Sequence, residues 1–463
     1  MVSLFFGVVS IALYIYFKAN MLMIWPYYLI MVCIYLFGYR SEKFDILEPY
    51  NGISILHMLY ALASASYALQ HHALPYAGEF VNYNSISTFI NVTIISQLSI
   101  SLGNIVAYRK KTETKMSLSS KDVSQLSLVS VFLFFSLIII QYKALDIFHV
   151  SSYAERVLAE NVLKRKDNTS GLYDFINIIS QVLMIFLALD IIRKASNKIL
   201  KIFASLILFL LIARYVLAGD RASAVMAIVC ILAYVNYLYY RIPVSLSIFL
   251  SLSGYTAFSL LSIMRNSSNF SKMVELGGEY FQKHGLDMFS LANSGELTAG
   301  TNLIKIIKEI NGSSIDYVYG GGGHYLFGGN ILDSILTFIP RFIYEGREGF
   351  GNERFVKIFY PETYAIGGGN GYFLPIDGYW DFGILGVIVL MFLYSYAFTH
   401  FYKKFISNEK TVLSVIIYSL FFSQGIIFAM RSGCYASIKQ FLIYSFPLLI
   451  VFTIKKMIIR NKT

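Results

Sequence analysis

Two stretches of this chain, 143–171 and 265–382, contain many basic residues whose side chains could hold an anion. The formal net charge is +11, and a sizeable share of it lies in these stretches. The residues are Arg156, Lys164, Arg165, Lys166, Arg265, Lys272, Lys283, Lys305, Lys308, Arg341, Arg347, Arg354 and Lys357. They are dispersed and match no helix-turn-helix, RRM or zinc-finger pattern, so nucleic acid is a poor candidate. A phosphate-bearing lipid is the better one.

Glycine is concentrated in the second half of the longer stretch, at 319–330, 338–355 and 365–386. A glycine-rich backbone beside aromatic residues and arginine lets N–H groups approach an anion or a sugar closely. No G-x-x-x-x-G-K-[ST] motif is present, which excludes a nucleotide P-loop. The region therefore has the composition of a binding site for a phosphate or a glycan.

The elements that must position these residues are membrane spans. Hydrophobic residues make up 56% of the chain and charged residues only 14%, which a water-soluble chain of this length does not show. The start lacks a basic region and a cleavage site, so we interpret it as a retained span. The 3 cysteines and the scattered histidines show no ligand spacing, and we expect neither a metal site nor a cofactor.

Apolar segments long enough to cross the bilayer predict an all-α polytopic protein with about twelve transmembrane helices. The predicted ranges are 2–17, 21–39, 53–69, 85–107, 124–142, 172–192, 200–218, 222–240, 242–264, 383–402, 412–430 and 440–455. The division between the first two ranges is the weakest, and eleven spans would also fit.

The orientation follows from Lys and Arg in the short loops, which stay on the cytoplasmic side. Both termini are then cytoplasmic, and 143–171 and 265–382 become outer loops too long for this rule to govern. We expect the first half of 265–382 to form one or two helices along the membrane surface. The predicted organisation is a bundle of nine spans over 1–264, a large outer loop over 265–382, and three spans with a tail over 383–463.

Three segments resemble those of the bacterial O-antigen polymerases, also called oligosaccharide repeat-unit polymerases. Gly219, Asp220 and Arg221 match a G-x-R turn between two spans, Pro340 and Arg341 match an iPR element, and 378–386 matches the end of the large loop. Two positions depart from the family pattern. Asp377 stands where relatives commonly have Glu, and Arg347 is only a rough counterpart of a basic residue that follows iPR.

The resemblance implies a helical bundle of the GT-C type with one large periplasmic loop in the bacterial inner membrane. The implied enzyme is a glycosyltransferase that moves the growing glycan from undecaprenyl pyrophosphate to the terminal sugar of an incoming repeat unit, which is itself linked to undecaprenyl pyrophosphate. Donor and acceptor are then both lipid-linked oligosaccharides, membrane lipids surround the chain, and a chain-length regulator protein is a further candidate partner.

In this reaction arginine suits the pyrophosphate leaving group, because its planar fork binds phosphate oxygens in pairs and keeps its charge. The candidates are Arg214, Arg221, Arg265, Arg341, Arg347 and Arg431. Arg221 is the first choice, since it begins a helix after a Gly-Asp turn and helix N-termini favour anions. The alternative for such arginines is anchoring at the membrane interface, or for Arg221 a salt bridge to Asp220.

A base must also accept the proton of the attacking hydroxyl group, and His324, Asp377 and Glu345 are the candidates. Aromatic residues that could stack on sugar rings are Tyr325, Tyr372, Tyr379 and Trp380, against the alternative that they anchor the chain at the interface.

Two other classes of protein stay open. An O-antigen ligase uses the same donor with a different acceptor, and the IPR element and the loop end favour a polymerase over it. A flippase or other transporter usually shows internal repeats, and the sequence has no similarity between its halves.

Overall fold

The structure is a computed structural model, and it describes residues 21–41, 44–75, 79–109, 128–145, 170–217, 221–247, 297–312, 324–336, 351–365 and 369–460, with single residues between. Apart from two isolated β-bridges, the regular elements of these parts are helices. The long helices are α2 (Met21–Gly38), α3 (Pro49–His71), α4 (Tyr83–Arg109), α5 (Leu128–Leu145), α7 (Ser170–Lys194), α8 (Lys198–Leu217), α9 (Arg221–Leu238), α16 (Pro375–Ser407), α17 (Val412–Phe422) and α19 (Cys434–Arg460).

By length and composition, 5 described helices can cross a membrane: Pro49–His71, Tyr83–Arg109, Lys198–Val216, Pro375–Ser407 and Val412–Ser432. The last combines α17 with a π-helical segment, η4 (Ser423–Phe428), and α18 (Ala429–Ser432). The predicted range 2–17 lies outside the described residues and 242–264 lies largely outside them, and each other range overlaps one or more described helices. The polytopic helical fold is therefore confirmed, whereas the number of crossings stays a prediction.

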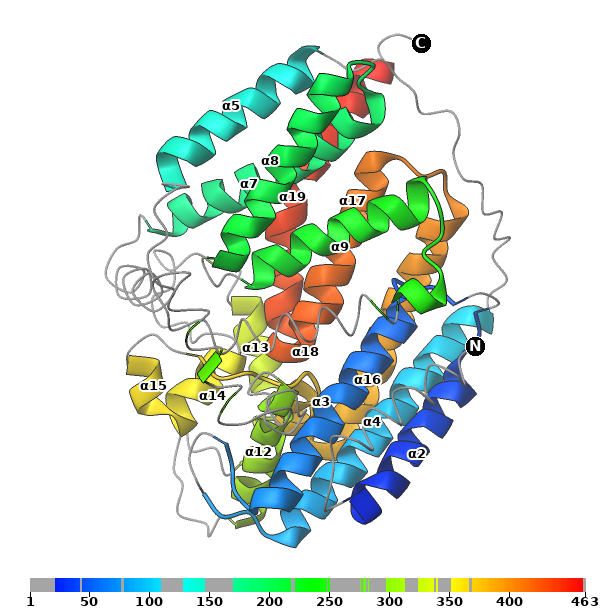
Figure 1. Ribbon diagram of the computed structural model, residues 1–463. Coiled ribbons are helices and arrows are strands. Elements are labelled where there is room, and N and C mark those ends of the chain that lie inside the picture. Colours follow the sequence, from blue (N-terminus) through cyan, green and yellow to red (C-terminus); the bar gives the residue numbers. More distant parts are fainter. Residues whose placement is uncertain are drawn as a thin grey trace.

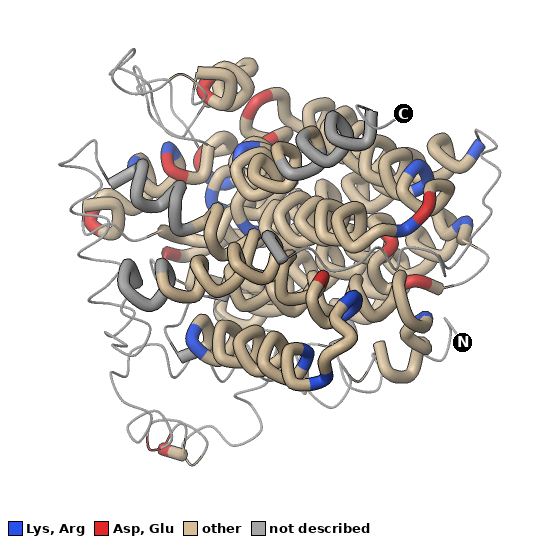
Figure 2. Tube along the Cα trace, turned by 90° about the horizontal axis from the view of Figure 1, so that it is seen from above, with Lys and Arg blue, Asp and Glu red and all other residues tan. Residues whose placement is uncertain are grey.

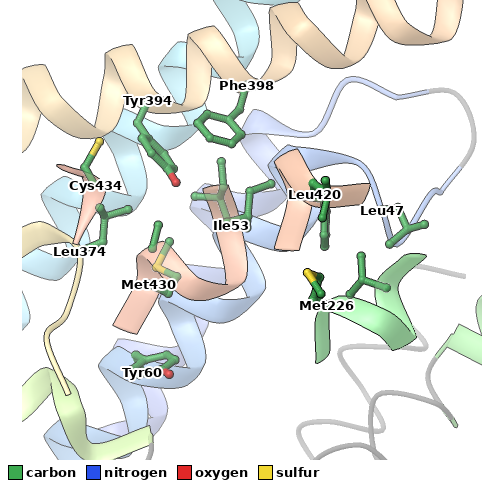
Figure 3. Packing of buried hydrophobic residues seen from close by; sticks show 14 of the residues in the cluster. Leu47, Ile53, Tyr60, Met226, Leu374, Tyr394, Phe398, Leu420, Met430 and Cys434 are labelled. Atoms are coloured by element: carbon green, nitrogen blue, oxygen red, sulfur yellow. The ribbon is translucent and has the colours of Figure 1, made fainter. Parts of the chain in front are cut away.

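The helices form two groups joined by three central helices (Figure 1). Helices α2, α3, α4 and α16 pack together, α5, α7 and α8 form the second group, and α9, α17 and α19 lie between them. Figure 2 shows charged residues mainly near helix ends, with long uncharged stretches between them. In Figure 3, Tyr394 and Phe398 of α16 are directed toward the region of Ile53 and Met430.

Short helices cover one end of the first group: α12 (Thr301–Gly312), α13 (Gly329–Leu336), α14 (Gly351–Phe359) and α15 (Pro361–Ala365). Helix α12 falls in the stretch for which we predicted helices along the membrane surface, and the position of this helix relative to the membrane stays a prediction. Its residues from Thr301 to Ile307 are buried, and it packs against α3, α4 and α16. The ammonium group of Lys305 can be buried because it forms ion pairs with Glu79 at 2.6 Å and with Glu309 at 2.9 Å.

The opposite end of the bundle is held by two buried acidic side chains, Asp45 and Glu48, which we call the acidic hub. Asp45 accepts hydrogen bonds from Tyr237 and Tyr402, both at 2.9 Å, and from Asn236 at 3.2 Å. Glu48 accepts one from Tyr108 at 2.7 Å. The hub therefore ties the loop before α3 to α4, α9 and α16.

Burial raises the pKa of Glu48 from 4.5 to about 8. Between these two pH values, the folded protein keeps a proton on Glu48 that the unfolded chain has lost. Because the unfolded state then binds fewer protons, stability falls as the pH rises from about 5 to 8. We expect Glu48→Gln, which imitates the protonated group, to raise the thermal unfolding midpoint in detergent at pH 8 and to change it little at pH 5. A difference between the two proteins that does not vary with pH would contradict this.

Candidate functional site

Helix α16 begins at Pro375, earlier than the predicted span 383–402, and it is broken near its start. The break lies at Phe382 (φ −140°, ψ 22°) and Gly383 (φ 62°, ψ −144°), and the positive φ of Gly383 is one that glycine adopts without strain. The break frees two carbonyl oxygens from the helix. Those of Trp380 and Asp381 accept the N–H groups of Leu326 at 2.9 Å and Phe327 at 3.1 Å.

Two glycines let the halves of α16 meet. A Cβ atom on Gly386 would lie 2.0 Å from the carbonyl oxygen of Gly378, and one on Gly378 would lie 2.6 Å from the carbonyl carbon of Gly386. No side chain fits at either position. The glycine spacing of the loop-end motif is thus explained by close backbone packing across the break.

Two aspartates of the same motif, one helical turn apart, each bind the start of another helix. The Asp377 carboxylate accepts the N–H of Cys434 at 2.6 Å, at the N-terminus of α19. The Asp381 carboxylate accepts the N–H of Asn330 at 3.0 Å, at the N-terminus of α13. Acidic side chains stabilise helix N-termini by satisfying free N–H groups. The motif therefore fastens α13 and α19 to the first half of α16.

Tyr372 completes this junction from the strand-like segment before α16. Its N–H donates to the carbonyl of Arg431 at 2.5 Å, and its ring contacts Phe355 of α14 with centroids 5.9 Å apart. Burial, together with the neighbouring Asp377 carboxyl, raises the pKa of its phenol well above the usual value. Tyr372 is thus a neutral hydroxyl group at physiological pH.

The four predicted sugar-stacking residues all lie around the first half of α16. The rings of Tyr325 and Tyr379 are 6.1 Å apart, and Trp380 contacts Phe355 at 6.1 Å. Tyr325 is half-buried, whereas Tyr372, Tyr379 and Trp380 are buried. The structure brings these residues together, and stacking on a sugar ring would need their covering helices to move.

The three candidate bases have different surroundings. His324 is exposed and directly precedes Tyr325. Asp377 is buried and holds the start of α19, which gives its carboxylate a structural task. Glu345 lies outside the described residues.

Three of the six candidate arginines lie in described helices, at ends directed away from the acidic hub. Arg221 begins α9, whose other end carries Tyr237 of the hub, and Arg214 lies in the last turn of α8. Arg431 lies in α18 and its carbonyl binds Tyr372, so it adjoins the junction. Arg265, Arg341 and Arg347 lie outside the described residues.

Some of the basic residues of the long loop are paired with carboxylates, which changes how its charge is interpreted. Lys305 and Lys308 both bind Glu79, at 2.6 and 3.0 Å, and Arg354 binds Asp333 at 2.8 Å. Burial opposes ionisation of Glu79, yet the two ammonium groups lower its pKa below the usual value. The charges of these three residues are thus balanced by carboxylates of the same chain, whereas the sequence predicted that the basic residues of this stretch bind an anion from outside the protein.

Sequence reasoning missed three residues of the junction: Asp381, Asn330 and Asp333. Asp381 stands in the loop-end motif and was available as a signal, because it follows Asp377 by one helical turn. Asn330 and Asp333 have no recognisable motif. The packing of α13 against α16 alone brings them to the junction.

A family model described as O-antigen polysaccharide polymerase Wzy matches residues 1–462. The chain belongs to this family. Its members polymerise O-antigen repeat units, so the resemblance predicted from the G-x-R turn, the iPR element and the loop end is confirmed. No curated protein and no solved structure matches the chain. Family membership and the candidate spans together make this a multi-pass membrane polymerase.

Proposed function

We propose that the chain lengthens a glycan at the outer leaflet of the bacterial inner membrane. The growing glycan leaves undecaprenyl pyrophosphate and is joined to the terminal sugar of an incoming lipid-linked repeat unit. The family match supports polymerisation. The observation that carries the proposed site is the broken start of α16, where the loop-end motif gathers buried aromatic, amide and acidic side chains beside Arg431.

The reaction breaks the bond between the glycan and the pyrophosphate, and negative charge develops on the departing phosphate oxygen. Cations fixed in place before the reaction stabilise that charge most effectively. We assign the stabilisation of this charge to Arg431, to Arg214 in the last turn of α8 and to Arg221 at the start of α9. Arg265, Arg341 and Arg347 belong to the same proposal on the basis of sequence.

The attacking hydroxyl group must lose its proton to a base within hydrogen-bond reach. We propose His324 for this role, because it is exposed beside the aromatic cluster while Asp377 is bound to a helix terminus. Glu345 is the alternative. The reaction as proposed uses no metal ion and no cofactor.

The test is an in vitro reaction of the purified protein with its lipid-linked repeat unit, without nucleotide sugar or divalent metal. We expect a ladder of products from the parent, and a loss of rate of about 100-fold or more for Arg431→Ala, as when one charge-stabilising donor is removed. Arg40→Ala is the matched control, because Arg40 lies at the opposite end and donates to the carbonyl of Tyr39. Equal activity of both variants would refute the assignment of Arg431.

A strain that lacks the protein separates the other two classes. A polymerase defect leaves the lipid core capped by single repeat units. A ligase defect leaves an uncapped core with long carrier-linked glycan, and a flippase defect leaves repeat units in the cytoplasm. We expect the first result.

A further inference from the structure

Helix α13 has its polar side inward and its apolar side outward. Asn330, Asp333 and Ser334 are buried, whereas Leu332 and Ile335 are 57% and 61% exposed. A helix on the surface of a water-soluble protein shows the reverse arrangement. The outer face of α13 therefore suits contact with lipid, and its inner face forms one wall of a polar interior.

Behind α13 lie buried polar atoms that have no hydrogen-bond partner among the described residues. Among them are both side-chain amide atoms of Asn330, the Oδ2 atom of Asp381 and the Nε1 atom of Trp380. All three side chains are at most 1% exposed. We call these three residues the polar cluster.

The polar cluster faces the start of α14. A Cβ atom on Gly351 would lie 2.7 Å from Oδ1 of Asn330 and 2.9 Å from the hydroxyl of Tyr372. Trp380 contacts Phe355 and Phe359 on the same helix, with ring centroids 6.1 and 5.9 Å apart. The ion pair between Arg354 and Asp333 joins α14 to α13 across the cluster. Access to the cluster therefore requires α13 and α14 to separate.

Buried polar groups without partners are unfavourable and rare in native proteins, so several at one place need an explanation. The unmatched set combines two donors, the Asn330 amide and the Trp380 indole, with two acceptors, Oδ1 of Asn330 and Oδ2 of Asp381. Sugar hydroxyl groups donate and accept, and so match a mixed set. A diphosphate only accepts in its ionised form, and the carboxylate of Asp381 would repel it.

We propose that Asn330, Trp380 and Asp381 bind the hydroxyl groups of a sugar of the lipid-linked repeat unit when α13 and α14 move apart. The apolar face of α13 keeps this subsite next to the bilayer, where the lipid of the substrate resides. The inference rests on the proposed function and adds residues that recognise the sugar, distinct from the arginines assigned to the pyrophosphate.

The first experiment compares the purified parent with Asn330→Leu, which removes the unmatched amide and keeps a side chain of similar shape. We expect an unfolding midpoint that is unchanged or higher, and a KM for the lipid-linked repeat unit that rises about tenfold, the loss of one or two hydrogen bonds. Asn302→Leu is the matched control, because Asn302 is also buried but its amide binds the carbonyl of Gly371 and the hydroxyl of Tyr360. That variant should lower the midpoint.

An unchanged KM in Asn330→Leu would overturn the inference, as would a lowered midpoint, which would show a structural amide. If the parent itself makes no polymer, the proposed function fails instead.

The second experiment uses the fact that the chain has 2 tryptophans, so that Trp25→Phe leaves Trp380 as the single tryptophan, whose emission is excited selectively at wavelengths that tyrosine does not absorb. We expect its emission to shift when the lipid-linked repeat unit is added and to stay unchanged with sugar-free polyprenyl diphosphate. An equal shift with both compounds, or with neither, would overturn the assignment to a sugar. The variant Asp381→Asn keeps an oxygen that can accept the N–H of Asn330 at the start of α13, and it replaces the acceptor Oδ2 with an NH₂ donor. This variant should abolish the emission shift.

Discussion

Replacing Gly386 with alanine is expected to abolish polymerisation. The new Cβ atom would lie 2.0 Å from the carbonyl oxygen of Gly378, which belongs to the backbone and cannot move aside as the end of a flexible side chain would. Overpacking of this kind costs about 3 kcal/mol or more. Because the first half of α16 carries Asp377 and Asp381, its displacement would also release the starts of α13 and α19.

The measurement is the in vitro product ladder together with the thermal unfolding midpoint. Gly312→Ala serves as the control, because the space around Gly312 at the end of α12 is open to 4 Å. That variant should keep both the midpoint and the ladder. Parent-like activity of Gly386→Ala would mean that the halves of α16 do not meet as described.

Asp377→Ala and Asp377→Asn are expected to differ sharply. Alanine removes the acceptor of the Cys434 N–H group and leaves a buried donor unpaired, at a cost of about 2 kcal/mol or more. Asparagine keeps an oxygen at the same position. We therefore expect the alanine variant to lose stability and activity together, and the asparagine variant to keep activity within about tenfold of the parent.

The same pair of variants separates a structural carboxylate from a catalytic base. Removing a general base costs about 100- to 10,000-fold in rate, and an amide does not replace it. If Asp377→Asn folds with the parental midpoint and yet makes no polymer, Asp377 is the base and His324 is not. The asparagine of that variant would then cap α19 without serving the reaction.

The positions of the long helices could be predicted from the sequence, because hydrocarbon demands a continuous apolar segment. The ranges 53–69 and 85–107, for example, fall within α3 and α4. The start of α16 could not be predicted in this way. Asp377 and Asp381 made 375–382 look like a polar loop, whereas both carboxylates are used inside the protein to hold other helices.

The candidate site was predictable in kind and less so in detail. Glycine and aromatic enrichment pointed to this region, and the structure brings Tyr325, Tyr372, Tyr379 and Trp380 together there. The break at Gly383 could not be distinguished from other glycines of the motif, since only three-dimensional packing shows which one takes a positive φ. The unmatched amide of Asn330 has no sequence signal, because the sequence does not show whether an asparagine is buried or exposed.

Helix α16 is held at its C-terminal end by the acidic hub and at its start by other helices. Beyond Gly383, α16 is anchored by Tyr402 to Asp45 and by Lys403 to the carbonyl of Ala107. Its first two turns are attached instead to α13 and α19. A tilt of those turns about Phe382 and Gly383 would have to open the contact between Gly378 and Gly386, while the rest of α16 stays anchored at the acidic hub. The two ends of α16 are therefore secured by different partners, so that a change at one end need not disturb the other.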